Sequence, residues 1–529
     1  MNGERALPAS SRLRVFAPLF LLTSHVSPLF AQRHDALHYD IAITLPATDS
    51  VIHAVVTTRW RLTGSRPAVL DLDASLTVTA ASVDGRPVRW RRDGNTIVLP
   101  VSGRAGAEVT TSVDYTGIAT DGLIIRGAGA DRTIFADNWP ERARYWLASN
   151  DDPADKASVS WQINAPSRLR VVANGRITTQ DNLSGGMIRW RFDNPEPIPV
   201  YTMVVGAAVF DIAVLPAAAC TTRCVPVMVF TNSGDSGGPA FLNASRMIDF
   251  FSGRFGRFPY AELRHVQSTT RFGGMENATA IFYDTRAIHE GTLRETTVAH
   301  ETAHQWFGDA VTEAAWLHLW LSEGFASYAA ALWAEHEGGD SALRTTMADA
   351  RQAVMASAVV DRPILDSAVS DPMQRLNPNN YQKGSWVLHT LRGLVGDEVF
   401  FRGIRRYVRT FEHRNALSDD FAGIMGEEAG RDLTWYFRQA LSQPGYPVLE
   451  VSTEVEGGHL VISVRQVQKE AWGLFRIPNL EVLVDDRTIA VDLQGALTRV
   501  ATHWAGDGPP RVVKVDPRGK WLLTVSGER

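Results

Sequence analysis

Hydrophobic and polar residues alternate in short runs from about residue 38 to residue 212. Two of these runs are Ile41-Ala42-Ile43-Thr44-Leu45 and residues 55–62, and turn-forming pairs such as Asp84-Gly85 and Asp93-Gly94 fall between runs. Alternation with a period of two buries one face of a strand, and Asp-Gly is typical of tight turns. The pattern predicts an all-β domain, a saddle or sandwich of sheets, over residues 32–214.

After Pro239 the apolar residues follow a helical spacing instead, and alanine becomes dense. Glycines and prolines separate the helical stretches, as expected where helices end. Helices are predicted near residues 240–255, 293–308, 322–337, 341–357, 381–395 and 420–442. We therefore expect a mainly helical second domain over residues 215–445.

Alternation resumes after the segment Gln443-Pro444-Gly445-Tyr446-Pro447 and continues almost to the end of the chain. Apolar residues recur at every second position in runs near residues 449–451, 460–464 and 482–484. These runs predict a small C-terminal β-sandwich domain over residues 446–529. The fold class expected for the whole chain is therefore multidomain α+β, in the order β domain, helical domain, small β domain.

The first 31 residues have the composition of a secretory signal peptide. Arg5, Arg12 and Arg14 precede a short apolar run, and the small residue Ala31 stands before Gln32. The run is too short and too interrupted for a good membrane span. We expect an exported protein, periplasmic or secreted. The alternative is an uncleaved N-terminal segment that anchors the chain to a membrane.

Charge and cysteine content narrow the possible partners and the compartment. The 529 residues carry a formal net charge of −5, which gives no sign of the basic surface that nucleic-acid binding requires. The two cysteines of the chain are Cys220 and Cys224. In an exported protein so close a pair favours a disulfide, with two free thiols as the alternative.

The strongest chemical signal is the run His300-Glu301-Thr302-Ala303-His304. Residues four apart lie on one face of a helix, so both imidazoles can bind one cation. Glu301 follows His300 directly and can reach a metal-bound water instead of the metal. The spacing therefore predicts a zinc site with two histidine ligands and a carboxylate base.

Glu323, in the next predicted helix, supplies the third ligand that a catalytic zinc site needs. One Zn²⁺ per chain is expected. Zinc lowers the pKa of its bound water and polarises a carbonyl group. Glu301 would then accept the proton of the water and pass it to the leaving amine as a general base and acid. The developing oxyanion needs a further hydrogen-bond donor.

Three separated motifs resemble the gluzincin zinc aminopeptidases of the aminopeptidase N and leukotriene hydrolase family. The first is the His-Glu-x-x-His run with Glu323. The second is Gly273-Gly274-Met275-Glu276-Asn277, which is similar to the Gly-x-Met-Glu-Asn segment of that family. The third is Tyr381-Gln382-Lys383-Gly384, and the run Trp146–Pro153 is similar less specifically.

The resemblance implies a thermolysin-like catalytic domain and peptide substrates with a free N-terminus. It implies that residues 273–277 bind the substrate, with Glu276 holding its α-amine and Gly273-Gly274 lining the peptide. Tyr381 would stabilise the oxyanion. The chain departs from the family at Asn138-Trp139-Pro140, where many members have a second amine-binding residue, and at Ala278, where many have Trp.

Two rival functions share the same motifs. A zinc endopeptidase would use the same ligands but bind peptides internally, and an amine-binding Glu276 argues against it. A non-catalytic peptide-binding protein would normally lack a ligand or the base, yet His300, Glu301, His304 and Glu323 are all present.

Overall fold

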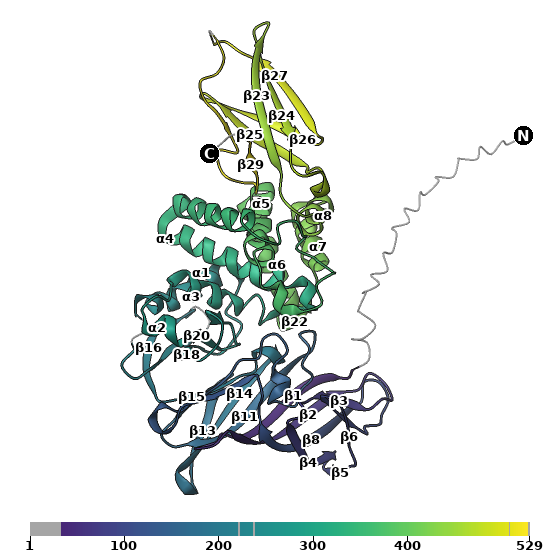
Figure 1. Ribbon diagram of the computed structural model, residues 1–529, viewed down its shortest axis with the longest axis vertical. Coiled ribbons are helices and arrows are strands. Elements are labelled where there is room, and N and C mark those ends of the chain that lie inside the picture. Colours follow the sequence, from purple (N-terminus) through teal and green to yellow (C-terminus); the bar gives the residue numbers. More distant parts are fainter. Residues whose placement is uncertain (1–32, 221–222, 236–237, 507, 527–529) are drawn as a thin grey trace, which may run out of the picture.

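A computed structural model describes residues 33–220, 223–235, 238–506 and 508–526 (Figure 1). The predicted signal segment, residues 1–31, lies outside the described residues. Three parts follow one another along the longest axis of the molecule, a β-rich part, a helical part and a second, smaller β part (Figure 1). This order confirms the fold class expected from the hydrophobic pattern.

The N-terminal part is built on an eight-stranded sheet in the order β13-β14-β11-β1-β2-β8-β4-β5. Alternate residues of each central strand enter the core, as in β1, where Tyr39, Ile41 and Ile43 are buried. The strands of this sheet are β1 (Asp35–Thr44), β2 (Val51–Arg61), β4 (Leu76–Val83), β5 (Arg86–Pro87), β8 (Glu108–Ile118), β11 (Lys156–Pro166), β13 (Arg176–Leu183) and β14 (Met187–Pro199).

Two smaller sheets complete the N-terminal part. The four-stranded sheet has the order β12-β15-β10-β9, and the three-stranded sheet has the order β3-β7-β6. Their strands are β3 (Ala68–Asp71), β6 (Arg91–Asp93), β7 (Thr96–Leu99), β9 (Leu123–Arg126), β10 (Thr133–Ala136), β12 (Arg170–Ala173) and β15 (Val205–Ala208).

A five-stranded mixed sheet connects the N-terminal part to the helices. Its order is β16-β17-β18-β20-β19, and β16 spans the predicted domain boundary at residues 214/215. Its strands are β16 (Phe210–Ala218), β17 (Val225–Asn232), β18 (Leu263–Ser268), β19 (Gly274–Met275) and β20 (Ala280–Asp284). A disulfide joins Cys220 and Cys224 in the loop between β16 and β17.

Most predicted helices are present, with two differences. The stretch predicted near 420–442 is two helices, because Gly430 adopts a left-handed φ of 61° and ends the first of them. Helices at residues 285–289 and 397–411 were not predicted. The helices are α1 (Ala244–Phe255), α2 (Thr285–His289), α3 (Glu295–His304), α4 (Trp320–Met355), α5 (Gly384–Val395), α6 (Asp397–Phe411), α7 (Ser418–Ala429) and α8 (Thr434–Ser442).

Helix α4 is not continuous. Gly339 adopts a positive φ of 68° inside it, so the chain forms two helical segments, as the separate stretches 322–337 and 341–357 predicted. Among the described residues no helix is both long and apolar enough to cross a bilayer. Strands β21 (Val311–Glu313) and β22 (Arg414–Ala416) pair in parallel beside the helices.

The C-terminal part packs a four-stranded sheet, β27-β24-β23-β29, with a three-stranded sheet, β26-β25-β28. Buried aliphatic residues such as Leu460, Ile462 and Val482 form its core. Its strands are β23 (Val448–Glu456), β24 (His459–Gln466), β25 (Ile477–Val484), β26 (Arg487–Leu493), β27 (Leu497–His503), β28 (Val513–Val515) and β29 (Thr524–Val525).

Candidate metal centre and peptide cleft

A cleft of about 690 Å³ lies in the helical part. The short edge strand β19, the helices α3 and α4, and the turn that carries Tyr381 form its walls. It brings together nearly every residue predicted for the site from the sequence. Those lining the cleft are Gly273, Gly274, Met275, Glu276, His300, Glu301, His304, Glu323 and Tyr381.

Three donor atoms converge in this cleft. The Nε2 atoms of His300 and His304 lie 3.0 Å apart. Oε2 of Glu323 lies 3.2 Å from the first nitrogen and 3.4 Å from the second. Ligands about 2.0–2.1 Å from a tetrahedral zinc ion would be separated by about 3.3 Å, so the three atoms fit three corners of such a site.

The hydrogen bonds of His304 fix which of its nitrogens faces the other donors. Its Nδ1 lies 2.9 Å from the carbonyl oxygen of Phe307, to which it donates its proton. Nε2 therefore presents a lone pair to the converging donors. Two imidazole nitrogens and one carboxylate form the donor set that zinc hydrolases use, and Glu301 lies beside it without joining it.

Tyr381 lies directly against the converging donors. Its hydroxyl donates a hydrogen bond of 2.7 Å to Oε1 of Glu323, and its ring stacks on that of His300. Tyr381 belongs to a π-helical turn, Asn379–Lys383, a type of turn that often occurs at functional sites.

Two glycines allow this turn to approach α4. A Cβ atom built on Gly324 would lie 2.9 Å from Cα of Gly384 and 3.2 Å from the carbonyl oxygen of Asn380. Gly324 follows Glu323 directly, and Gly384 comes three residues after Tyr381. The close backbone contact therefore positions the tyrosine hydroxyl next to the carboxylate.

The edge strand β19 lies across the cleft from these residues. Gly274 pairs with Tyr283 of β20, and a Cβ atom at Gly274 would collide with the carboxylate of Glu301. Glycine is thus required for the strand to pass so close to α3. Asn277, the last residue of the predicted substrate-binding segment, is buried and does not line the cleft.

Glu276 and Glu301 form a second acidic group next to the metal donors. One ligand atom from each, together with one from His304, lie within 4.8 Å of one another. Burial raises the pKa of both carboxyl groups. A cation bound between the carboxylates would favour their ionised forms.

Sequence patterns did not identify the residues that hold Glu276 in place. The side-chain amide of Gln305 donates to the carbonyl oxygen of Glu276 at 2.9 Å and to Oδ2 of Asp309 at 2.7 Å. Tyr201 donates a hydrogen bond of 3.3 Å to the carbonyl oxygen of Gly308, in the loop after α3. Only the position of Gln305, next to His304, could have suggested such a role, and Tyr201 comes from a distant part of the chain.

The loop after α3 is held from the N-terminal part. Lys156, at the start of β11, donates hydrogen bonds of 2.7 and 2.8 Å to the carbonyl oxygens of Asp309 and Ala310. Burial lowers the pKa of this ammonium group to about 7, against the opposing effect of nearby Asp309. The β-rich part therefore contributes directly to the position of the metal-binding helix.

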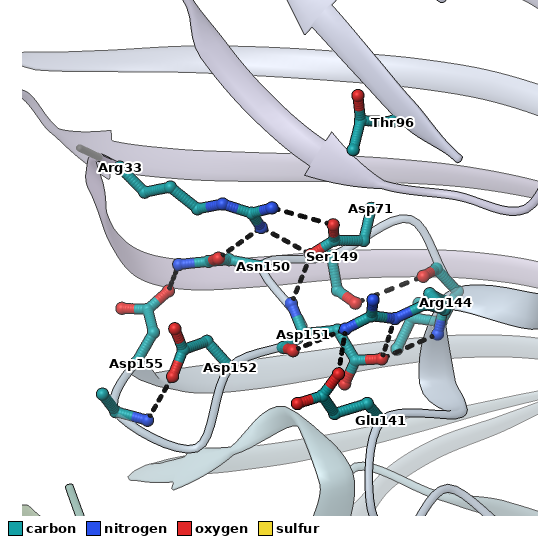
Figure 2. Close-up of polar contacts among 12 residues, drawn as sticks. Arg33, Asp71, Thr96, Glu141, Arg144, Ser149, Asn150, Asp151, Asp152 and Asp155 are labelled. Carbon is teal, nitrogen blue, oxygen red and sulfur yellow. Dashed lines mark hydrogen bonds and ion pairs between the residues drawn. The ribbon is translucent and has the colours of Figure 1, made fainter. Parts of the chain in front are cut away.

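The Trp146–Pro153 segment contributes Asn150, Asp151 and Asp152 to a network of buried and half-buried polar and charged side chains (Figure 2). Arg144 pairs there with Asp151 at 3.0 Å and with Glu141 at 3.1 Å. The other oxygen of Glu141 accepts a hydrogen bond from Trp316, whose ring contacts that of Trp139 in the cleft wall. The network supports the cleft and contributes no residue to the converging donors.

Asn138 does not supply a second amine-binding group. Its amide donates to the carbonyl oxygen of Met203, and its Oδ1 accepts from Trp146. Asn138 is fully buried and does not line the cleft. Because Asn138 does not reach the cleft, Glu276 remains the residue predicted to bind the substrate amine beside the converging donors.

Comparison with known proteins identifies the helical part. Residues 240–439 match the sequence profile described as the peptidase family M1 domain. The helical part is therefore similar to M1 peptidase domains. The matched residues include β18 to β20, all of α1 to α7 and every residue of the converging donor set.

Relatives of the M1 domain are aminopeptidases and zinc metallopeptidases. A leucyl aminopeptidase from Saccharolobus solfataricus is 24% identical over 462 residues, which cover 82% of this chain and 55% of the relative. The chain thus spans about half the length of the curated relatives it matches.

Solved structures support the fold. A variant M1 zinc metallopeptidase from Deinococcus radiodurans, described as bound to a Tyr-Ser-Ala substrate, has 25% identity and a TM-score of 0.69, covering 78% of this chain and 94% of its own. Aminopeptidase A from Legionella pneumophila has 17% identity and a TM-score of 0.82, covering 94% of this chain and 60% of its own.

The contact between Gly324 and Gly384 predicts a specific loss of stability. Gly324→Ala should lower the free energy of unfolding by about 1–3 kcal/mol, because backbone atoms surround the new Cβ and one helix must shift. Gly423→Ala, on the exposed side of α7 with open space around it, should be neutral or stabilising by up to about 1 kcal/mol. Urea denaturation of both variants measures the difference, and equal effects would contradict the packing described.

Proposed function

We propose that this chain is a zinc-dependent aminopeptidase that hydrolyses the N-terminal bond of peptides. The observation that carries the proposal is the pair of buried carboxylates, Glu276 and Glu301, beside the three converging donors. A free α-amine is a cation near neutral pH, and the pair offers it a charged partner next to the metal site. The names of the relatives support the same activity.

His300, His304 and Glu323 would hold the zinc ion, since their donor atoms have the identity and spacing that zinc requires. Bound zinc supplies a Lewis acid that makes water nucleophilic near neutral pH and polarises a carbonyl group. Three protein ligands leave a fourth position open for chemistry.

Glu276 is proposed to orient the substrate. It is buried, 6% exposed, and its backbone carbonyl oxygen accepts a hydrogen bond from the side-chain amide of Gln305. A carboxylate so confined can pair with the α-ammonium of a peptide, a cation that the backbone of an internal segment does not carry. An internal peptide would leave it desolvated and without a partner, which is costly. The first peptide bond is thereby placed at the metal.

Glu301 and Tyr381 are proposed to perform the proton transfer and the charge stabilisation. Glu301 accepts a proton from the attacking water and donates it to the leaving amine. The hydroxyl of Tyr381, which contacts Glu323 in this structure, turns toward the carbonyl oxygen of the substrate and donates to the developing oxyanion.

Export from the cytoplasm is a further part of the proposal. The composition of residues 1–31 supports it, and so does the disulfide between Cys220 and Cys224, since disulfides persist in oxidising compartments.

The role of Glu301 predicts a separation of metal binding from catalysis. Glu301→Gln should retain one zinc ion per chain, because Glu301 is not a ligand, while kcat falls by about 10²–10⁴-fold. Metal analysis and kinetics on the same preparation measure both. Retained turnover would remove Glu301 from the mechanism, and lost zinc would make it a ligand.

Tyr381 should act mainly in the transition state. Tyr381→Phe should lower kcat by about 10²-fold or more and leave KM nearly unchanged, because the hydroxyl binds charge that only the transition state carries. Thermal unfolding of the variant provides the control. Near-normal kcat together with a large drop in Tm would show that Tyr381 serves packing alone.

Glu276 decides between an aminopeptidase and an endopeptidase. Glu276→Ala should raise KM and lower kcat/KM on peptides with a free amine, with unchanged zinc content, because the partner of the α-ammonium is removed. N-acetylated copies of the same peptides should be poor substrates of the wild type. Equal cleavage of free and acetylated peptides at internal bonds, followed by mass spectrometry, would establish the endopeptidase alternative instead.

A further inference from the structure

Charged residues of both signs line the cleft. Glu276 and Glu301 share a group with His304, whereas His300 lies one turn earlier on α3. Arg294 stands at the N-terminal cap of the same helix and also lines the cleft. Arg294 therefore precedes both metal-binding histidines along α3, whereas Glu301 lies between them and Glu276 follows β19.

Arg294 is the one arginine or lysine among the described residues that line the cleft. Its side chain is exposed, and within the described part of the chain no hydrogen bond or ion pair joins it to another residue. Its neighbours in the wall, Thr296 and Thr297, carry no negative charge. The guanidinium group of Arg294 is thus available to a ligand in the cleft.

The separation along the helix sets the length of that ligand. Arg294 precedes His300 by six residues and His304 by ten, which corresponds to about 9 Å and about 15 Å of helix rise. An extended peptide advances about 3.3–3.6 Å per residue, so three or four residues span about 10–14 Å. The carboxylate of Glu276 lies beside His304. A peptide of that length, with its amine at Glu276 and extended along α3, would reach Arg294 with its other end.

We propose that Arg294 determines specificity by binding a carboxylate at the third or fourth residue of the substrate. This proposal rests on the aminopeptidase function proposed above. The carboxylate is either the free C-terminus of a tri- or tetrapeptide or an acidic side chain at the same place. Arginine suits both, because its planar guanidinium group pairs with a carboxylate through two parallel hydrogen bonds.

Asp349 is the charge in the cleft that opposes this role. It is exposed on the second segment of α4 and lines the same cleft, without forming an ion pair with Arg294 in the described structure. A carboxylate near Asp349 would be repelled. Asp349→Asn is therefore a matched control, since it removes a charge of the opposite sign from the same cleft.

The test compares tri-alanine and tetra-alanine with a free C-terminus, their C-terminal amides, and Ala-Ala-Asp amide. The wild type should have a kcat/KM about two- to fivefold higher for the free acid than for the amide, the range of a solvent-exposed ion pair. Arg294→Gln should remove that ratio, Arg294→Lys should keep part of it, and Asp349→Asn should keep or increase it. Hexa-alanine and its amide should be cleaved equally by every variant.

The aspartate peptide distinguishes the two sources of the carboxylate. A rate like that of the free acids would show that Arg294 accepts any carboxylate at this distance, and a rate like that of the amides would restrict it to the chain end. Equal rates for acids and amides in the wild type, or a ratio that survives Arg294→Gln, would overturn the role of Arg294 and leave the aminopeptidase proposal intact. Failure to cleave any of the peptides would overturn both.

Discussion

Three electron-pair donors converge in a buried space, and a bound cation stabilises this arrangement. The nitrogens of His300 and His304 and the oxygen of Glu323 lie 3.0–3.4 Å from one another. Burying such donors without a positive partner is costly, whereas zinc satisfies all three at once. The orientation of α3, the start of α4 and the hydrogen bond from His304 to the Phe307 carbonyl all serve this convergence.

Close backbone contacts bring the other functional groups to the same point. Gly274 leaves room for the carboxylate of Glu301, and the pair Gly324 and Gly384 lets the Tyr381 turn touch α4. Each of these glycines is next to, or within a few residues of, a residue with a proposed chemical role. The positions of the side chains with proposed chemical roles therefore depend on how closely the backbone segments that carry them approach one another.

The sequence predicted what local periodicity and short motifs encode. His300 and His304 follow from helical spacing, and alternation gave the two β-rich parts. The helical pattern did not reveal α6. It also did not reveal the break at Gly430, because a glycine within an apolar helical pattern does not by itself show where a helix ends. Lys156 and Tyr201 were also missed, since their contacts with the catalytic loop join residues more than 100 positions apart.

The most direct test of the account is a screen of aminoacyl fluorogenic substrates with the purified full-length protein. The panel is measured before and after dialysis against a chelator, and again after addition of one equivalent of Zn²⁺, with zinc content determined each time. The account predicts hydrolysis of free-amine substrates that falls with the zinc content and returns with the added ion. Undiminished hydrolysis by the metal-free protein would contradict it.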